Sequence, residues 1–175
     1  GNQFCNDFPS CLDTRQKLGY QNCDTSCDDE FEFQDGYCYF QTDLNVLQTI
    51  IENSLDTDSL NMNMDANSNG DIEPLELGTQ KWSAGRLETL DCFWDTTTCN
   101  LNIPIPDNID DLDSLKILDL QQNNLSGEIP ENICTMFSIM DTLNLSTNNY
   151  CPCYPKCSVQ SDMYDSFIVT QDTTN

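Results

Sequence analysis

The chain has 175 residues and carries 30 acidic against 6 basic side chains, a formal net charge of −24 at pH 7. A surface this negative repels phosphate groups, so neither nucleic acid nor an anionic membrane surface is expected as a partner. No apolar stretch approaches the roughly 20 residues that cross a bilayer, so no membrane span is predicted. Calcium is the natural counter-ion for so many carboxylates.

Cysteine is abundant, with 11 residues, and histidine is absent. This density is typical of oxidising compartments and predicts a disulfide-bonded extracellular protein, either secreted or held at the cell surface. Zinc is the alternative for dense cysteines, but the lack of histidine and of two C-x-x-C pairs disfavours it. The odd count leaves one cysteine that is free, bonded to another chain, or bonded to residues outside this sequence.

The first 42 residues contain five cysteines among scattered polar residues. The segments EFEF (30–33) and YCYF (37–40) flank Gln34-Asp35-Gly36, a pattern typical of a short β-hairpin. We therefore predict a cysteine-rich, cap-like segment over residues 1–42.

Helical spacing begins just after this segment, with apolar residues at Leu44, Leu47, Ile50, Ile51 and Leu55. It predicts an amphipathic helix over 43–55, with Thr42 or Asp43 as its N-cap. We expect this helix to cover the end of a core.

A repeat of 24–25 residues occupies the second half of the chain. Four positions are matched 25 residues later, namely Leu118, Leu120, Asn123 and Leu125 by Leu143, Leu145, Asn148 and Tyr150. Four are matched 24 residues earlier, namely Leu125, Ile129, Pro130 and Ile133 by Leu101, Ile105, Pro106 and Ile109. This period with an L-x-L-x-x-N pattern indicates leucine-rich repeats. The leucines should point from short strands into a shared core, and the asparagine should bond the backbone where the chain turns.

These residues resemble the plant-type leucine-rich-repeat family, in which NNLSGEIP (123–130) is a close match to the repeat. The resemblance implies an α/β fold, a short solenoid of parallel strands with an N-terminal helical cap and disulfide-rich ends. It implies that residues 43–99 form the N-terminal cap, 100–150 the repeats, and 151–175 the C-terminal cap and tail. Only two to three coils are present, so a broad concave recognition surface is not expected.

The resemblance extends to the caps. The family's N-terminal cap has a tryptophan and then a C-x-W-x4-C element, matched here by Trp82 and by the segment from Cys92 to Cys99. It implies a Cys92–Cys99 disulfide, with Trp94 packed on the first coil. The segment NNYCPCYPKC (148–157) resembles the family's C-terminal cap, in which paired cysteines follow a final asparagine.

Further disulfides are expected near the ends of the chain. Cys134 and Cys153 lie near the last coil, and we expect them to pair and lock it. Four more cysteines are expected in disulfides without assigned partners, Cys151, Cys157, Cys5 and Cys11.

A calcium-type loop interrupts the predicted cap at 65–76. The segment satisfies the EF-hand pattern, with oxygen-bearing residues at positions 1, 3, 5 and 12, glycine at position 6 and an aliphatic residue at position 8. The predicted ligands are Asp65, Asn67, Asn69, Asp71 through its carbonyl, Glu73 and Glu76. The alternative is an imperfect leucine-rich coil, since Leu60, Met62 and Met64 alternate as in a strand. Two neutral amide ligands predict a weak Ca²⁺ affinity, near the millimolar range.

Two N-glycosylation sequons lie in the repeats, at Asn124 and Asn144. Asn124 lies at a predicted turn and is the easier site. Asn144 lies between inward-pointing leucines, so a sugar there would face the concave side and obstruct docking.

The two ends of the chain resemble each other. Asn2, Phe4, Cys5, Phe8, Pro9 and Cys11 align with Asn148, Tyr150, Cys151, Tyr154, Pro155 and Cys157 at a constant offset of 146. The chain could be one period of a tandem array, a subunit with two related caps, or a case of chance similarity between cysteine-rich loops. Related ends suit head-to-tail assembly into a filament.

Catalysis is not expected, because the usual nucleophile arrangements need a histidine base and no nucleotide-binding motif occurs. Two functions remain. The first is a self-associating structural or adhesive glycoprotein of a fibre or cell coat. The second is a recognition module, such as a receptor ectodomain or inhibitor, that binds a protein or carbohydrate.

Overall fold

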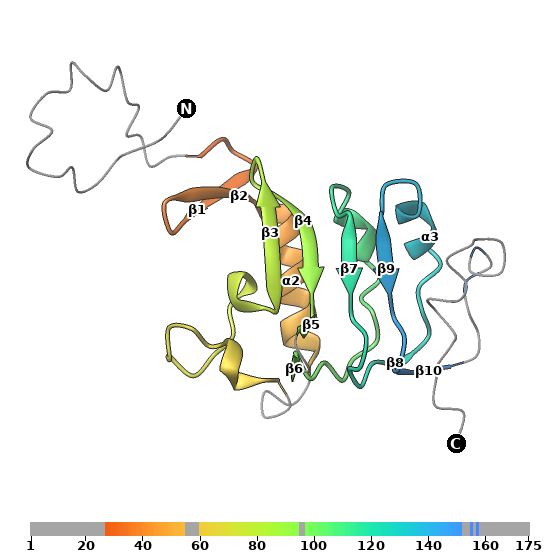
Figure 1. The fold of residues 1–175 in the computed structure, drawn as a ribbon. Coiled ribbons are helices and arrows are strands. Elements are labelled where there is room, and N and C mark those ends of the chain that lie inside the picture. Colours follow the sequence, from red (N-terminus) through yellow and green to blue (C-terminus); the bar gives the residue numbers. More distant parts are fainter. Residues whose placement is uncertain (1–26, 55–59, 95–96, 152–154, 156, 158–175) are drawn as a thin grey trace, which may run out of the picture.

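Four strands and one long helix form the centre of the chain in the computed structural model, which describes residues 27–54, 60–94, 97–151, 155 and 157. Together they make a mixed α/β domain (Figure 1). Three disulfides lie within the described residues. None of its helices in these described ranges is long and apolar enough to cross a membrane.

The predicted hairpin is confirmed. Strands β1 (Phe31–Gln34) and β2 (Tyr37–Phe40) pair antiparallel around a two-residue turn. Asp35 and Gly36 occupy this turn with φ values of 50° and 87°, the left-handed conformations that a tight hairpin requires. The Cys27–Cys38 disulfide ties the preceding residues to β2.

Helix α2 (Gln41–Asn53) follows β2 directly and buries Leu44, Val46, Leu47, Ile50 and Ile51. The predicted helix is therefore present, but it begins two residues early and its N-cap is Phe40, so the predicted caps Thr42 and Asp43 are wrong. The reason lies in a distant contact: the buried Asp43 carboxylate accepts hydrogen bonds from Arg86 and from the backbone nitrogen of Leu87 instead.

The main sheet has the strand order β3-β4-β7-β9 (Figure 1). Its members are β3 (Thr79–Ser83), β4 (Arg86–Asp91), β7 (Ile117–Asp119) and β9 (Thr142–Asn144). Strands β3 and β4 are antiparallel, whereas β4, β7 and β9 are parallel in one register that aligns Leu90, Leu118 and Leu143. The parallel strands expected at residues 118 and 143 are therefore confirmed.

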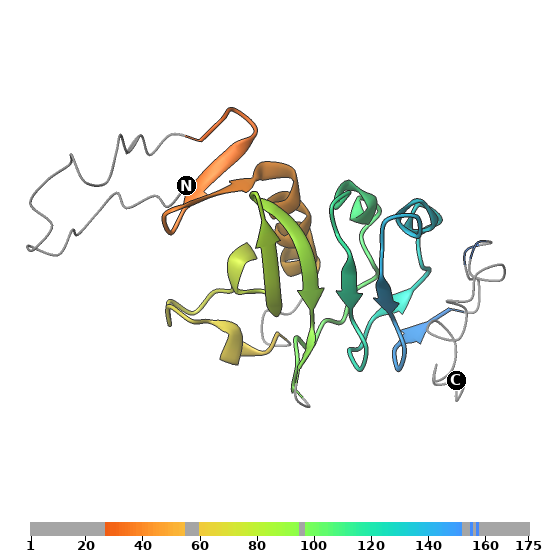
Figure 2. The ribbon, with the colours of Figure 1, turned by 45° about the horizontal axis from the view of Figure 1, so that its top comes forward.

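Shorter elements lie outside this sheet. Strands β8 (Ser126–Gly127) and β10 (Asn149–Tyr150) pair in parallel below β7 and β9 (Figure 2), and β5 (Phe93–Trp94) pairs with β6 (Thr97–Thr98). The short helices are η1 (Met62–Met64), η2 (Pro74–Glu76), η3 (Ile109–Asp111) and α3 (Ile133–Met136).

One hydrophobic core joins α2 to the strands. Leu118, Leu120, Leu143 and Leu145 are all buried in it, together with the earlier matches Leu101 and Ile105. The side chain of Asn148 accepts a hydrogen bond from the backbone nitrogen of Leu125 at 3.0 Å and donates to the Leu120 and Leu145 carbonyls. Asn123 accepts in the same way from the nitrogen of Leu101 at 3.0 Å. Each asparagine thus bonds the backbone at its turn and links two segments that lie one repeat apart.

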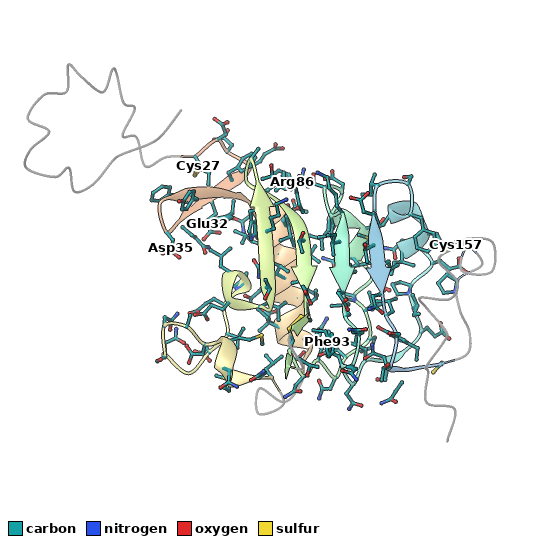
Figure 3. All side chains as sticks on the ribbon, in the orientation of Figure 1. Cys27, Glu32, Asp35, Arg86, Phe93 and Cys157 are labelled. Carbon is teal, nitrogen blue, oxygen red and sulfur yellow. A yellow bond between two sulfur atoms is a disulfide. The ribbon has the colours of Figure 1, made fainter. Side chains whose placement is uncertain are left out.

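Two disulfides close the later part of the chain. Cys92 and Cys99 are bonded, as the cap resemblance implies. Cys134 is bonded to Cys157, so the expected Cys134–Cys153 pairing is wrong; the Cα atoms of Cys134 and Cys157 lie 5.7 Å apart, within bridging range. Cys151 is exposed and free in place of the expected disulfide. Figure 3 shows Cys27 and Cys157 at opposite ends of the domain.

Several predictions fall on parts that the structure does not describe. Cys5, Cys11, Cys153 and the packing of the Trp94 side chain lie outside the described residues, as do most of the aligned positions at the two ends of the chain.

Candidate calcium loop and exposed sheet face

The predicted calcium loop, residues 65–76, runs from the end of η1 to the end of η2 on the side of the domain away from β9 (Figure 1). Met62–Met64 form a 3₁₀ turn, so the strand suggested by their alternation is not formed. Ile72, the aliphatic residue at position 8 of the pattern, is buried in the main core and anchors the loop.

The first half of the loop folds around its own side-chain oxygens. The Asp65 carboxylate accepts hydrogen bonds from the backbone nitrogens of Asn69 at 3.2 Å and Gly70 at 2.9 Å. The amide oxygen of Asn67 accepts from the nitrogen of Asn69, and that of Asn69 from the nitrogen of Asp71. Gly70 adopts a φ of 97°, which favours glycine at this point of the turn.

The second half brings two more carboxylates to the same place. The Glu73 carboxylate accepts hydrogen bonds from Nδ2 of Asn67 at 2.9 Å and of Asn69 at 2.6 Å. Glu76 accepts from the backbone nitrogens of Ala66, Asn67 and Glu73. Hydrogen bonding to Glu76, and then to Asn69 and Asn67, lowers the pKa of Glu73, so its charged form is favoured.

The donor set fits calcium in its chemistry. Asp65, Glu73 and Glu76 supply carboxylate oxygens and the two asparagines supply amide oxygens, which are the hard ligands that Ca²⁺ prefers. No group of three or more His, Cys, Asp or Glu side chains is arranged to hold a metal ion in the described parts of the chain. A cation at this loop would therefore depend on the amide oxygens, and it would replace the two Nδ2 groups that now face Glu73.

The residues that flank the loop meet beside the Cys92–Cys99 disulfide. The backbone nitrogen of Gly78 donates to the sulfur of Met64 at 3.1 Å. A Cβ atom on Gly78 would lie 2.6 Å from the Asp91 carbonyl oxygen and 3.1 Å from the sulfurs of Cys92 and Cys99, so only glycine fits there. A cavity of about 490 Å³ lies between the loop and this disulfide.

The exposed face of the main sheet carries opposite charges in a row. Glu88 on β4 forms salt bridges with Lys81 on β3 at 3.5 Å and with Lys116, next to β7, at 2.5 Å. This pairing lowers the pKa of Glu88 and raises that of Lys116. Arg86, the remaining basic residue in the described ranges, pairs with Asp43 and Asp113. All three basic side chains in the described ranges are therefore already paired within the chain.

A second row on this face is acidic and amide-bearing. Asp91, Asp119 and Asn144 are aligned across β4, β7 and β9. Burial is the main cause that raises the pKa of Asp119, and the neighbouring charge of Asp91 adds to it. Nδ2 of Asn144 donates to Asp119 at 3.2 Å and to the Gln121 side chain at 2.8 Å. Nothing in the sequence singled out Asp119, because its register opposite Asp91 appears only when the strands pair.

The two sequon asparagines differ sharply in their surroundings. Asn124 is exposed at the turn before β8, whereas Asn144 is half-buried within β9.

The pairing of Asp43 with Arg86 was not predicted from the sequence. The scarcity of basic residues was the one feature of the sequence that pointed to a structural role for Arg86. No known protein family, curated protein or solved structure matches the chain.

Proposed function

We propose that the chain is an extracellular structural or adhesive glycoprotein module, built on a short leucine-rich-repeat stack, that self-associates or forms part of a tandem array or filament. One observation carries the assembly proposal: among the described residues, the main sheet is open, with β3 and β9 as its two edge strands. Edge strands expose unpaired backbone groups and are natural sites for contact with another chain.

The repeat architecture is supported by agreement between sequence period and strand register. Residues 25 positions apart in sequence, such as Leu118 and Leu143, are direct neighbours on parallel strands. Asn123 and Asn148 make equivalent backbone bonds one repeat apart. Such stacks bury their aliphatic residues between neighbouring coils, so each end needs a cap or another copy.

The extracellular location is supported by the cysteines. Three disulfides lie within the described residues. In the cytosol, reductants would keep these cysteines in the reduced thiol form. The exposed thiol of Cys151, close to β10, is accessible for a bond to another chain.

Calcium is part of the proposal. Asp65, Asn67, Asn69, Glu73 and Glu76 would hold the ion with their side chains, together with the Asp71 carbonyl. Bound calcium would supply positive charge to an acidic loop and hold its two ends together. Because the loop packs through Gly78 on the Cys92–Cys99 disulfide, this would also stiffen the N-terminal end of the stack.

Head-to-tail contact suits these features. A domain whose two ends differ can associate through a heterologous interface, which propagates as a filament when it does not close into a ring. Here one end carries β3 with the β1–β2 hairpin, and the other carries β9 with the Cys134–Cys157 disulfide. The high negative charge opposes this association, and calcium would reduce the repulsion.

The test is the size of the full, oxidised chain. We expect light scattering coupled to gel filtration to give masses above the 19.9 kDa monomer that rise with protein concentration and with millimolar Ca²⁺. Electron microscopy of the same sample should show linear particles. A Cys151→Ser variant separates non-covalent assembly from disulfide exchange. A monomer at every concentration, with and without Ca²⁺, would contradict self-association.

The exposed sheet face favours a second candidate, a recognition module that binds a protein or carbohydrate. Ile117 is 36% exposed at the centre of this face, between the charged row and the row of Asp91, Asp119 and Asn144. A strictly monomeric protein, combined with ligand binding that Ile117→Glu abolishes, would support this function over the first.

A further inference from the structure

We infer that Asn124, and not Asn144, carries an N-linked glycan in the folded protein, and that its first sugar lies over an amide-lined hollow beside the turn. This inference rests on the proposed extracellular function, because only a chain that enters the secretory pathway meets the glycosylating enzyme.

Within the described part of the chain, the Asn124 side chain is free at Nδ2, the atom that reacts. Asn124 is exposed, and its amide oxygen accepts a hydrogen bond from Nδ2 of Asn149 at 2.6 Å. The backbone nitrogen of Asn124 donates to the Leu101 carbonyl at 2.7 Å. Among the described residues, no hydrogen bond engages Nδ2 of Asn124 itself. The contact through its oxygen therefore holds the amide while Nδ2 stays available.

Both polar atoms of the Asn144 side chain already form hydrogen bonds. Its Nδ2 donates to Asp119 and to Gln121, and its oxygen accepts from the backbone nitrogen and the hydroxyl of Ser146. It is also the last residue of β9 and lies between the buried residues Leu143 and Leu145. A sugar on Nδ2 would remove one of its hydrogens and crowd the sheet face around Asp119. A chain with a glycan at this position would fold poorly.

The surface next to Asn124 suits a neutral sugar. A hollow of about 340 Å³ is lined by five residues that all carry an amide side chain, Asn100, Asn102, Gln122, Asn123 and Asn124. Amides both donate and accept, as sugar hydroxyls and acetamido groups require. No carboxylate lines the hollow, although the chain has a net charge of −24.

The covalent step is ordinary glycosyl transfer. A bond forms between Nδ2 of Asn124 and C1 of the first N-acetylglucosamine. The bond from C1 to the diphosphate of a lipid-linked oligosaccharide donor breaks, and one proton leaves Nδ2. The diphosphate departs with the lipid, so no oxidant or further reactant is needed.

The first experiment maps occupancy. The full chain is secreted from eukaryotic cells and treated with peptide N-glycosidase in heavy-oxygen water, which marks each glycosylated asparagine as labelled aspartate. We expect the label on Asn124 and almost none on Asn144. The matched variants are Ser126→Ala and Ser146→Ala, which destroy one sequon each and leave the asparagine in place. Ser126→Ala should lose the mass of one glycan and Ser146→Ala none.

A second measurement tests the hollow. Trimming the glycan to one sugar should still slow backbone hydrogen exchange at residues 100–102 and 122–124, relative to glycan-free Ser126→Ala. Equal exchange in the two proteins would overturn the docking of the sugar in the hollow.

Failure of this inference is distinguishable from failure of the proposed function. A chain that is secreted with its disulfides formed but is bare at Asn124, or is labelled equally at Asn144, overturns the glycan assignment alone. A chain that reaches the medium only with reduced cysteines, or not at all, contradicts the extracellular location.

Discussion

Arg86 binds the carboxylate of Asp43 with two hydrogen bonds of 3.0 Å and thereby fastens helix α2 to the first parallel strand of the sheet. Figure 3 shows Arg86 beside β4, at the end of the strand where α2 begins. The same carboxylate accepts a hydrogen bond from the backbone nitrogen of Leu87 at 2.8 Å. Its side chain is 1% exposed, so the three donors replace water completely.

Removing this carboxylate should destabilise the fold. Asp43→Ala leaves the backbone N–H of Leu87 without its acceptor and leaves the partly buried guanidinium of Arg86 with the exposed Asp113 alone. We expect a loss of about 3 kcal/mol in the free energy of unfolding. Chemical denaturation of the oxidised protein measures it. The matched control is Asp113→Asn, which removes the exposed partner of the same Arg86 and should cost about 0.5 kcal/mol. Equal losses for the two variants would contradict this role of Asp43.

Asp119 should make stability depend on pH. Burial raises its pKa in the folded state above the unfolded value of about 3.9, so the folded protein holds the proton more tightly. The resulting destabilisation is absent below the unfolded pKa and grows as pH rises through the folded pKa. Asp119→Asn removes it. The stability of this variant relative to the native chain should therefore increase as the pH rises above the unfolded pKa of about 3.9. A difference that is constant or falls as the pH rises argues against a buried, destabilising carboxylate.

Calcium binding should be weak and should need the last residue of the loop. We expect calorimetry to give a dissociation constant of about 10⁻⁴–10⁻³ M, because amides supply part of the ligand set. Glu76→Gln should weaken binding at least about tenfold by removing a predicted two-oxygen ligand. Glu131→Gln is the control, since that carboxylate is exposed and lies outside the loop. Equal affinities in the two variants would place calcium elsewhere.

Asn148 should be essential to the last described turn. It is 2% exposed and bonds the nitrogen of Leu125 and the carbonyls of Leu120 and Leu145. Asn148→Ala leaves these groups buried without partners and should cost about 2–3 kcal/mol. The comparison is Asn149→Ala on the neighbouring exposed residue, which should cost well under about 1 kcal/mol. Thermal unfolding of the two variants decides whether the buried amide has this role.

Local and periodic patterns predicted much of the fold. The hairpin turn at Asp35-Gly36 follows from its residues, and the parallel strands follow from a repeat that places Leu118 and Leu143 in equivalent positions. The six residues of the proposed calcium site share hydrogen bonds within one short loop, but calcium binding by them stays a prediction.

The failures have a common cause in long-range contacts. Asp43 looked like a cap because helix starts favour acids, but its partner lies 43 residues away. Cys134 was predicted to bond Cys153, but the fold places Cys157 next to it and these two form the disulfide. The alternation before the loop suggested a strand, but Asn61 caps a 3₁₀ turn there and donates to the Thr98 carbonyl. In each case the observed contact depends on which residues are close in space, and the spacing of residues along the sequence does not give this.

The most direct test of the repeat stack is a double-mutant cycle between Leu118 and Leu143, measured as the free energy of unfolding of Leu118→Ala, Leu143→Ala and the double variant. If β7 and β9 are parallel neighbours over one core, the two losses should be coupled by about 0.5 kcal/mol or more. The control pair Leu47 and Leu143 joins α2 to the last strand and should be additive within about 0.3–0.5 kcal/mol. Full additivity of Leu118 and Leu143 would contradict the stack on which the proposed function depends.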